Sequence, residues 1–328
     1  MPSTDILVVS VDSTSGWRTA ATELTNSLSR SGAAVARVAP GPLRRVRTFA
    51  LTDFVEARAA RQACRHAIAR HDPEAVIYCS ISIALLWPQP GAIWIDSLAA
   101  ENRPGRHGVW QRPVERGRIA QAPLILGMSE RALAPLQTEP DVVVPVPVEP
   151  SGAPAPRRDI DAIAYAGNPE KRRLDYVLRA WSRARRTGET LVVAGTDQAN
   201  RTDGVHVAGR LAPAEYRALL RRARVFVAAP RREDYGIAAL EALADGCLLV
   251  TTPAPGPYPA RGIAHELDPR LVDHDLAKTL RVALDDPAPG YAQKARELLA
   301  PFSRAAVDQT LSQQVLPRLI SRFKTPPA

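Results

Sequence analysis

Short, uninterrupted apolar runs alternate with helix-like stretches along most of the chain, and this pattern constrains the fold most strongly. In the first half the runs are DILVVSV (5–11), AVARVAP (34–40), AVIYCSI (75–81), AIWID (92–96) and PLILGM (123–128). Runs that are apolar at every position predict strands buried on both faces, and the helical stretches between them predict parallel pairing. We therefore expect the first half to form a parallel α/β sheet.

A proline-rich segment interrupts this pattern, which then starts again. The segment EPDVVVPVPVEPSGAPAPRRD (139–159) contains six prolines, and this composition predicts a stiff interdomain linker. After it, AIAYAG (162–167), ETLVVAG (189–195) and RVFVAAP (224–230) repeat the strand pattern. We expect two parallel-sheet α/β domains, residues 1–148 and 149–302, with ligands bound in a cleft at the carboxyl ends of their strands.

The cysteines and the lengths of the apolar runs indicate the cellular compartment in which the protein is expected. The three cysteines are far apart, and they form no metal-ligand spacing with the six histidines, so we expect buried thiols, a reducing compartment and no metal site. The Asp-x-Asp at 159–161 matches a metal signature, but so short a match often occurs by chance. No apolar run reaches the ~20 residues of a membrane span, and the chain enters a strand-like run at once, which predicts a cytoplasmic protein without a signal peptide.

The formal net charge of +9 favours anionic partners such as nucleotides, acidic lipid surfaces or nucleic acid. No helix-turn-helix, zinc-finger spacing or basic aromatic sheet is evident, so we do not expect nucleic acid to be a partner. Arg58, Arg61 and Arg65 form one stripe of the helix expected at 53–70. This stripe is either a solvated face or a contact for an acidic membrane surface or an anionic acceptor.

The stretch PRREDYGIAALEALADGCLLVTTP (230–253) carries the clearest site pattern. A helix is expected to begin near Gly236, so the backbone N–H groups around Tyr235, Gly236 and Ile237 become free donors for a phosphate. Glu233 and Glu241 flank these donors, and carboxylates suit hydroxyl groups rather than phosphate. One would bind a sugar and the other a ribose. The alternative is a solvated loop glutamate and a glutamate that interacts with the helix dipole.

This stretch resembles the donor-binding signature of family-4 glycosyltransferases of the GT-B fold. The signature residues are Glu233, Tyr235-Gly236, Glu241-Ala242, Ala244 and Gly246, followed by a strand. The resemblance implies two Rossmann-like domains facing a cleft and retaining transfer of a hexose-type sugar from a UDP-, GDP- or other nucleotide-diphosphate sugar, with no metal or other cofactor. It also implies that Glu233 holds hydroxyls of the transferred sugar and Glu241 holds the ribose.

Other segments extend the resemblance. Gly16 in SGW (15–17) matches the glycine loop that follows the first strand, and YAGNPEKRRLD (165–175) resembles the segment that neutralises the diphosphate. In this second segment Asn168 follows Gly167 where the family has arginine, and Arg172 with Lys171 matches the usual lysine. Arg172, Lys171 and Glu233 are therefore our candidate catalytic residues. The candidate donor-binding residues are Gly16, Gly167, Asn168, Gly195, Arg210, Tyr235, Gly236, Ile237 and Glu241.

The acceptor, which the sequence leaves open among a small molecule, a lipid and a glycan, is expected on the first domain. In DSLAAENRPGRHGVWQRP (96–113), Asp96 ends a strand, and we take Asp96, Arg103 and His107 as candidate acceptor-binding residues. An ordinary surface loop is the alternative. The resemblance further implies that the helical segment 303–328 packs back onto the first domain. A catalytically inactive scaffold that binds a nucleotide sugar or another anionic ligand remains the rival function, because Asn168 replaces the customary arginine.

Overall fold

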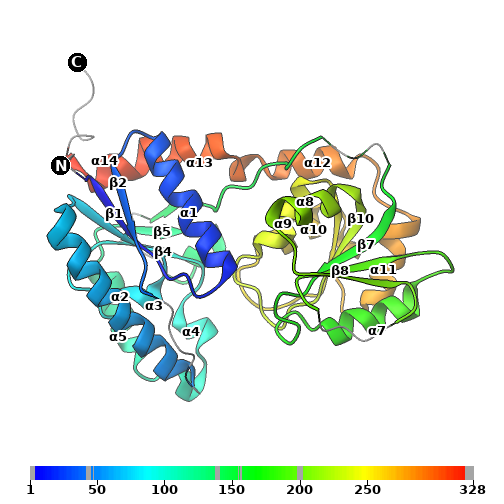
Figure 1. Cartoon of the computed structure of the whole chain (residues 1–328), viewed down its shortest axis with the longest axis horizontal. Helices are drawn as coiled ribbons and strands as arrows, with labels where there is room; N and C mark the ends of the chain where they lie inside the picture. Colours follow the sequence, from blue (N-terminus) through cyan, green and yellow to red (C-terminus); the bar gives the residue numbers. More distant parts are fainter. Residues whose placement is uncertain are drawn as a thin grey trace. The chain divides into compact units, whose positions relative to one another are not determined.

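The computed structural model describes residues 4–41, 46, 48–136, 141–153, 155, 157–197 and 202–321. The chain divides into two compact units, one formed by Met1–Pro147 with Arg304–Ala328 and the other by Val148–Ser303 (Figure 1). Each unit is built on one parallel sheet with helices packed against it, so the expected class of two parallel-sheet α/β domains is confirmed.

The first unit contains a six-stranded sheet in the order β2-β1-β3-β4-β5-β6. Its strands are β1 (Ile6–Val9), β2 (Val35–Val38), β3 (Ala75–Tyr78), β4 (Ala92–Ile95), β5 (Ile125–Gly127) and β6 (Asp141–Val143). Its helices before residue 147 are α1 (Ser15–Arg30), α2 (Phe49–His71), α3 (Ile81–Ala84), α4 (Ala99–Asn102), the 3₁₀ helix η1 (Gly105–Gly108), α5 (Gln111–Gln121) and α6 (Glu130–Leu133). Because strand side chains alternate between faces, Leu7 and Val9 share one face and pack with Ala60 and Cys64 of α2.

The second unit contains a five-stranded sheet in the order β11-β10-β7-β8-β9. Its strands are β7 (Ile160–Tyr165), β8 (Leu191–Ala194), β9 (Val205–Gly209), β10 (Ala223–Ala228) and β11 (Leu248–Thr251). Its helices are α7 (Leu174–Ala184), α8 (Pro213–Arg222), α9 (Ile237–Ala244), α10 (Pro259–Leu267), η2 (Pro269–Leu271), α11 (Leu276–Asp285), α12 (Tyr291–Leu298) and η3 (Ala300–Phe302). Since all strands are parallel, the loops that leave their carboxyl ends gather at one edge of the sheet.

The proline-rich segment is not a linker throughout, contrary to the expectation from its composition. Residues 141–143 form β6, which pairs with β5 in parallel register at the edge of the first sheet. Val144 and Val146 are fully buried, and the indole of Trp94 donates a hydrogen bond to the carbonyl of Val144. An edge strand tolerates neighbouring prolines because only one side of it needs hydrogen-bond donors. Pro140, Pro154 and Pro156 lie outside the described residues.

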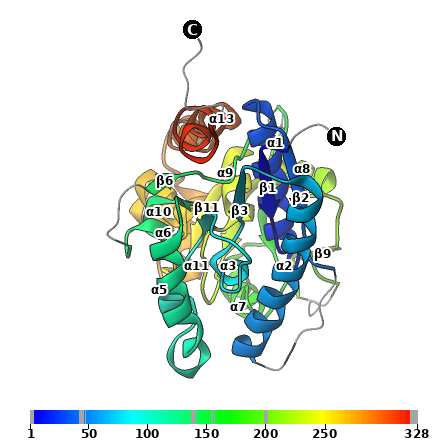
Figure 2. The ribbon, with the colours of Figure 1, turned by 90° about the vertical axis from the view of Figure 1, so that its left-hand side faces the viewer.

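The C-terminal helical segment belongs to the first unit. It consists of α13 (Arg304–Thr310), the π-helical turn η4 (Leu311–Val315) and α14 (Leu316–Leu319). Arg30 of α1 pairs with both carboxylate oxygens of Asp308, at 2.7 and 3.0 Å, and fixes α13 against α1. The π turn precedes Pro317, whose missing N–H and ring clash interrupt an α-helical ladder. Figure 2 views this region nearly along α13. Across the described part of the chain, no helix has the length and hydropathy needed to span a membrane.

Candidate active site

Two loops at the strand ends of the second unit bring Glu233 to the two expected cations. Glu233 follows β10, is 5% exposed, and accepts a hydrogen bond from the guanidinium of Arg172. The ammonium of Lys171 lies 3.9 Å from the other carboxylate oxygen. The loops are also joined through the backbone, because the N–H of Arg231 donates to the carbonyl of Lys171 at 3.0 Å. Residues about 60 positions apart thus form one charged cluster.

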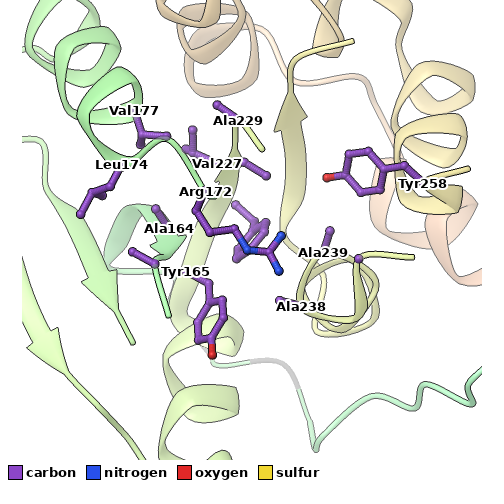
Figure 3. Close-up of a pocket in the computed structure, with 14 residues that line it drawn as sticks. Ala164, Tyr165, Arg172, Leu174, Val177, Val227, Ala229, Ala238, Ala239 and Tyr258 are labelled. Carbon is purple, nitrogen blue, oxygen red and sulfur yellow. The ribbon is translucent and has the colours of Figure 1, made fainter. Parts of the chain in front are cut away.

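Arg172 lines a small cavity that is partly open to solvent. Figure 3 shows its guanidinium directed toward Ala238 and Ala239 at the start of α9, with the rings of Tyr165 and Tyr258 on other sides of the cavity. Burial lowers the pKa of Arg172, and the neighbouring tyrosines oppose this shift. Arginine stays protonated in proteins nonetheless, so the cavity holds a poorly hydrated positive charge.

The amino end of α9 adds donors to this positive region. No side chain caps the helix, and the backbone N–H groups of Ile237 and Ala238 make no hydrogen bond with a described residue. Uncapped donors and the positive end of the helix dipole favour an anion there. The nearby guanidinium has the same preference, and Glu233 is the anion that now lies beside it. A diphosphate could bind both the free N–H groups of the helix and the guanidinium of Arg172.

Two glycines allow the close backbone approach in this region. Gly236 has φ +83°, and a Cβ there would lie 2.7 Å from the Tyr258 ring and 3.2 Å from Cγ of Glu233. A Cβ on Gly195, after β8, would lie 2.8 Å from the backbone nitrogen of Gly167, after β7. The strand-end positions expected to bind the donor therefore lie against one another, and larger residues would separate them.

Asn168 supplies no charge to the cluster. Its side-chain oxygen accepts the N–H of Lys171 at 3.0 Å, and this bond closes the turn that carries Lys171 and Arg172. Sequence reasoning missed Arg231, an exposed residue whose guanidinium forms no ion pair with a described residue. The signal for it was the arginine pair after Pro230. Its companion Arg232 is bound to Asp234 at 2.7 Å.

Glu241 lies apart from this cluster, in the second turn of α9. Arg217 of α8 pairs with it at 3.4 Å and with Asp245 at 2.6 Å. Burial raises the pKa of Glu241, whereas Arg217 opposes the shift. Sequence reasoning missed Arg217, because its pairing depends on how α8 packs against α9. The structure brings Glu233 to Arg172 and Lys171, and it places Glu241 in a separate ion-pair network.

The remaining donor candidates occupy the same unit, except Gly16. Tyr235 is 5% exposed, Ile237 begins α9, and Arg210 is exposed directly after β9. Gly16 lies in the first turn of α1 in the first unit, next to Thr14, whose hydroxyl caps the helix by accepting the N–H of Trp17.

The acceptor candidates lie after β4 in the first unit, and one of them is already paired. Arg103 makes two hydrogen bonds, at 2.8 and 3.0 Å, to the buried carboxylate of Asp53 in α2. It therefore anchors the loop to α2. Asp96 accepts a hydrogen bond from Ser97, and His107 is exposed in η1. Within the described ranges, no group of three or more histidine, cysteine or carboxylate residues is arranged to hold a metal ion.

Comparisons with known proteins agree with this arrangement. Residues 161–300 match the model of a family described as glycosyl transferases group 1. No curated protein matches the chain by sequence. Sucrose-phosphate synthase from Thermosynechococcus elongatus is similar in structure with a TM-score of 0.73 and 16% identity, over 95% of this chain and 98% of that one.

Two further solved structures cover the whole architecture. The α,α-trehalose-phosphate synthase (UDP-forming) from Burkholderia xenovorans matches with a TM-score of 0.66 and 13% identity, over 94% of this chain and 98% of that one. WaaG, a glycosyltransferase involved in lipopolysaccharide biosynthesis, matches with a TM-score of 0.65 and 14% identity, over the same shares. These findings agree with the resemblance noted from the sequence: residues 161–300 are similar to the glycosyl transferases group 1, and the chain has the two-domain fold of the GT-B glycosyltransferases.

Proposed function

We propose that the protein is a retaining glycosyltransferase that moves a hexose-type sugar from a nucleotide-diphosphate sugar to an acceptor, without a metal or other cofactor. The observation that carries this proposal is the cluster of Arg172, Lys171 and Glu233 beside the uncapped start of α9. It combines cations and backbone donors for a diphosphate with a buried carboxylate that suits sugar hydroxyls.

In the proposed reaction the diphosphate replaces Glu233 as the ion-pair partner of Arg172 and Lys171. The two cations and the N–H groups of Ile237 and Ala238 then stabilise the charge that develops on the leaving phosphate. Glu233, released from its ion pair, accepts hydrogen bonds from hydroxyls of the transferred sugar. Glu241 accepts hydrogen bonds from the ribose. Retention follows if the acceptor attacks on the face that the diphosphate leaves and the departing phosphate takes the acceptor's proton.

The proposed division of labour assigns the donor to residues 149–302 and the acceptor to residues 1–148, with 303–328 joined to the latter. Two similar structures are named as sucrose-phosphate synthase and as a UDP-forming synthase, which supports a UDP- or other nucleotide-diphosphate sugar as donor. A small molecule, a lipid or a glycan is the proposed acceptor, contacted by Asp96, Arg103 and His107. The free, buried thiols of Cys64, Cys79 and Cys247 support a cytoplasmic setting, and an acidic membrane surface is kept as a proposed contact.

A thermal-shift panel of nucleosides, nucleoside diphosphates and nucleotide sugars tests the proposal. A ligand present at about 100 times its Kd stabilises the folded state by roughly 2.7 kcal/mol, which is readily measured. We expect one base to be preferred and its diphosphate to act more strongly than its nucleoside. If no nucleotide or nucleotide sugar shifts the melting temperature, the proposal is wrong.

A second candidate function is an inactive scaffold that binds a nucleotide sugar or another anion. Asn168 favours it, because this side chain closes a turn and brings no charge to the diphosphate site. Slow release of free nucleotide from the preferred nucleotide sugar distinguishes the two functions. An enzyme hydrolyses its donor slowly in the absence of acceptor, whereas a binding protein shows a thermal shift with no release.

A further inference from the structure

We infer that one surface of the first unit, made by α2 and the segment around η1, docks on anionic phospholipid headgroups of a membrane. The inference does not depend on sugar transfer, because it concerns where the protein resides and not what it catalyses. Its first basis is an exposed apolar group that we call the apolar tip: Leu51 and Phe54 of α2 with Val109 and Trp110 after η1. Leu51, Phe54 and Val109 are 53%, 43% and 65% exposed.

The apolar tip is one structure although it comes from two parts of the chain. The rings of Phe54 and Trp110 meet edge to face with centroids 6.0 Å apart. The indole N–H of Trp110 donates to the carbonyl of Ala50 at 3.2 Å, which holds the η1 segment against the start of α2. Five large hydrophobic side chains are strongly exposed among the described residues, and three of them are Leu51, Phe54 and Val109. Their concentration at one place calls for a partner.

A row of arginines continues from the apolar tip along the same face of α2. Arg58, Arg61 and Arg65 are exposed and follow Phe54 at intervals of four, three and four residues, which keeps them on one side of a helix. The neighbouring stripe of the helix carries Ala57, Ala60 and Cys64, which are buried. The outward face of α2 is therefore apolar at its beginning and basic along its length.

Two carboxylates in or beside these segments, Asp53 and Glu115, are turned inward and do not offset this charge at the surface, whereas Glu56 of α2 is half-buried. Asp53 is 2% exposed and bound by Arg103, and Glu115 of α5 is 3% exposed and accepts the backbone N–H of Ala99. Burial raises the pKa of Glu115 to about 7, so this carboxyl is partly neutral near neutral pH. Arg116, also on α5, is exposed.

This combination fits a lipid surface better than another macromolecule. A few apolar side chains can enter the boundary between headgroups and acyl chains, while arginines beside them bind lipid phosphates. A stable protein interface needs roughly 800 Å² from each partner with an apolar centre, whereas here a few apolar side chains lie beside a row of three exposed arginines. Nucleic acid would match the charge, but the two most exposed residues of the apolar tip, Val109 and Leu51, are aliphatic and suit a hydrocarbon environment rather than base stacking.

Vesicle co-sedimentation of the full chain tests the inference. The probes are vesicles of phosphatidylcholine alone and vesicles of equal parts phosphatidylcholine and phosphatidylglycerol, without nucleotide. We expect binding to the anionic vesicles, weaker binding at higher salt, and little binding to phosphatidylcholine. Replacing Leu51, Phe54 and Val109 together by serine should weaken binding at least tenfold. Arg58→Gln with Arg65→Gln should cost about fivefold for each charge removed.

Matched controls remove the same kinds of side chain elsewhere. Val207→Ser changes an exposed hydrophobic residue of the second unit, and Arg179→Gln with Arg183→Gln removes two exposed charges from α7. These variants should bind like the parent. All the altered side chains are exposed, and unchanged melting temperatures will verify the fold. The inference is overturned if the parent does not bind anionic vesicles, or if the control variants lose as much binding as the α2 variants. Loss of sugar transfer would not affect this result.

Discussion

The variant Glu233→Gln separates the two partners of the central ion pair. The Glu233 side chain is 6% exposed and that of Arg172 is 24% exposed, so the pair is largely removed from water. Our proposal gives the two groups different ligands, namely hydroxyls for Glu233 and the diphosphate for Arg172. Without ligand they bind each other. The carboxylate therefore competes with the diphosphate for the guanidinium, and glutamine should relieve this competition.

The structure sets the size of both effects. Removing one charge from a buried pair costs about 3–5 kcal/mol. Because Arg172 keeps some contact with water and glutamine still offers an oxygen, we expect about 1–2 kcal/mol, or a melting temperature lower by roughly 2–8 °C. The same free energy no longer opposes the diphosphate, so its affinity should rise about five- to thirtyfold. Sugar transfer should fall, because the hydroxyls lose a charged acceptor.

Titration calorimetry with the preferred nucleoside diphosphate, thermal melts and a transfer assay measure these three quantities on one variant. Glu266→Gln, an exposed glutamate of α10, is the matched control and should behave like the parent. Tighter diphosphate binding together with slower transfer supports the competition. Weaker diphosphate binding by Glu233→Gln would refute it, since the carboxylate would then be holding the site in its binding geometry.

Three further variants test other parts of the account. Glu115→Gln should raise the free energy of unfolding above pH 7 by up to about 3 kcal/mol. Burial raises the pKa of Glu115 from 4.5 to about 7, so the folded chain holds a proton that the unfolded chain has lost, and the stability of the parent falls as the pH rises through this range. Urea melts at acidic and alkaline pH will show this fall in the parent, and the same fall in the variant would refute the assignment. Gly236→Ala should destabilise more than Gly188→Ala by about 1–3 kcal/mol, because both have positive φ but only Gly236 has neighbours within 4 Å; equal losses would show that the Tyr258 contact yields easily. Glu241→Gln should weaken nucleoside binding by about 1.5–3 kcal/mol, and unchanged affinity would remove the ribose role.

The local sequence pattern correctly predicted the strands of the second unit and the position of Glu233 on a loop. Continuous apolar runs predict parallel strands, and the expected helix start near Gly236 agrees with α9, which begins at Ile237. The linker predicted from the proline-rich segment was wrong in part, because Val142 and Val144 are buried at a sheet edge. A strand of three residues carries too little periodicity to outweigh the prolines around it.

The pairings of the charged side chains could not be predicted from the sequence. Arg103 is a candidate acceptor-binding residue, and the sequence did not indicate its bond to Asp53, which lies 50 residues earlier. Glu241 was matched to a ribose, and nothing local indicated that Arg217 would pair with it. Such contacts depend on helix packing, which brings together residues distant in the chain. The residue types at the site were therefore predictable, but not which of them neutralise each other without ligand.

The most direct measurement of the central claim compares diphosphate and nucleoside binding in the parent and in Arg172→Ala. Arg172 lies in the cavity at the start of α9, where the account places the diphosphate. Calorimetry should show at least tenfold weaker binding of the nucleoside diphosphate, as expected for the loss of a charge-assisted contact of about 1.5–3 kcal/mol. Binding of the nucleoside should be unchanged. An equal loss for both ligands would contradict the account, because Arg172 would then support only the fold.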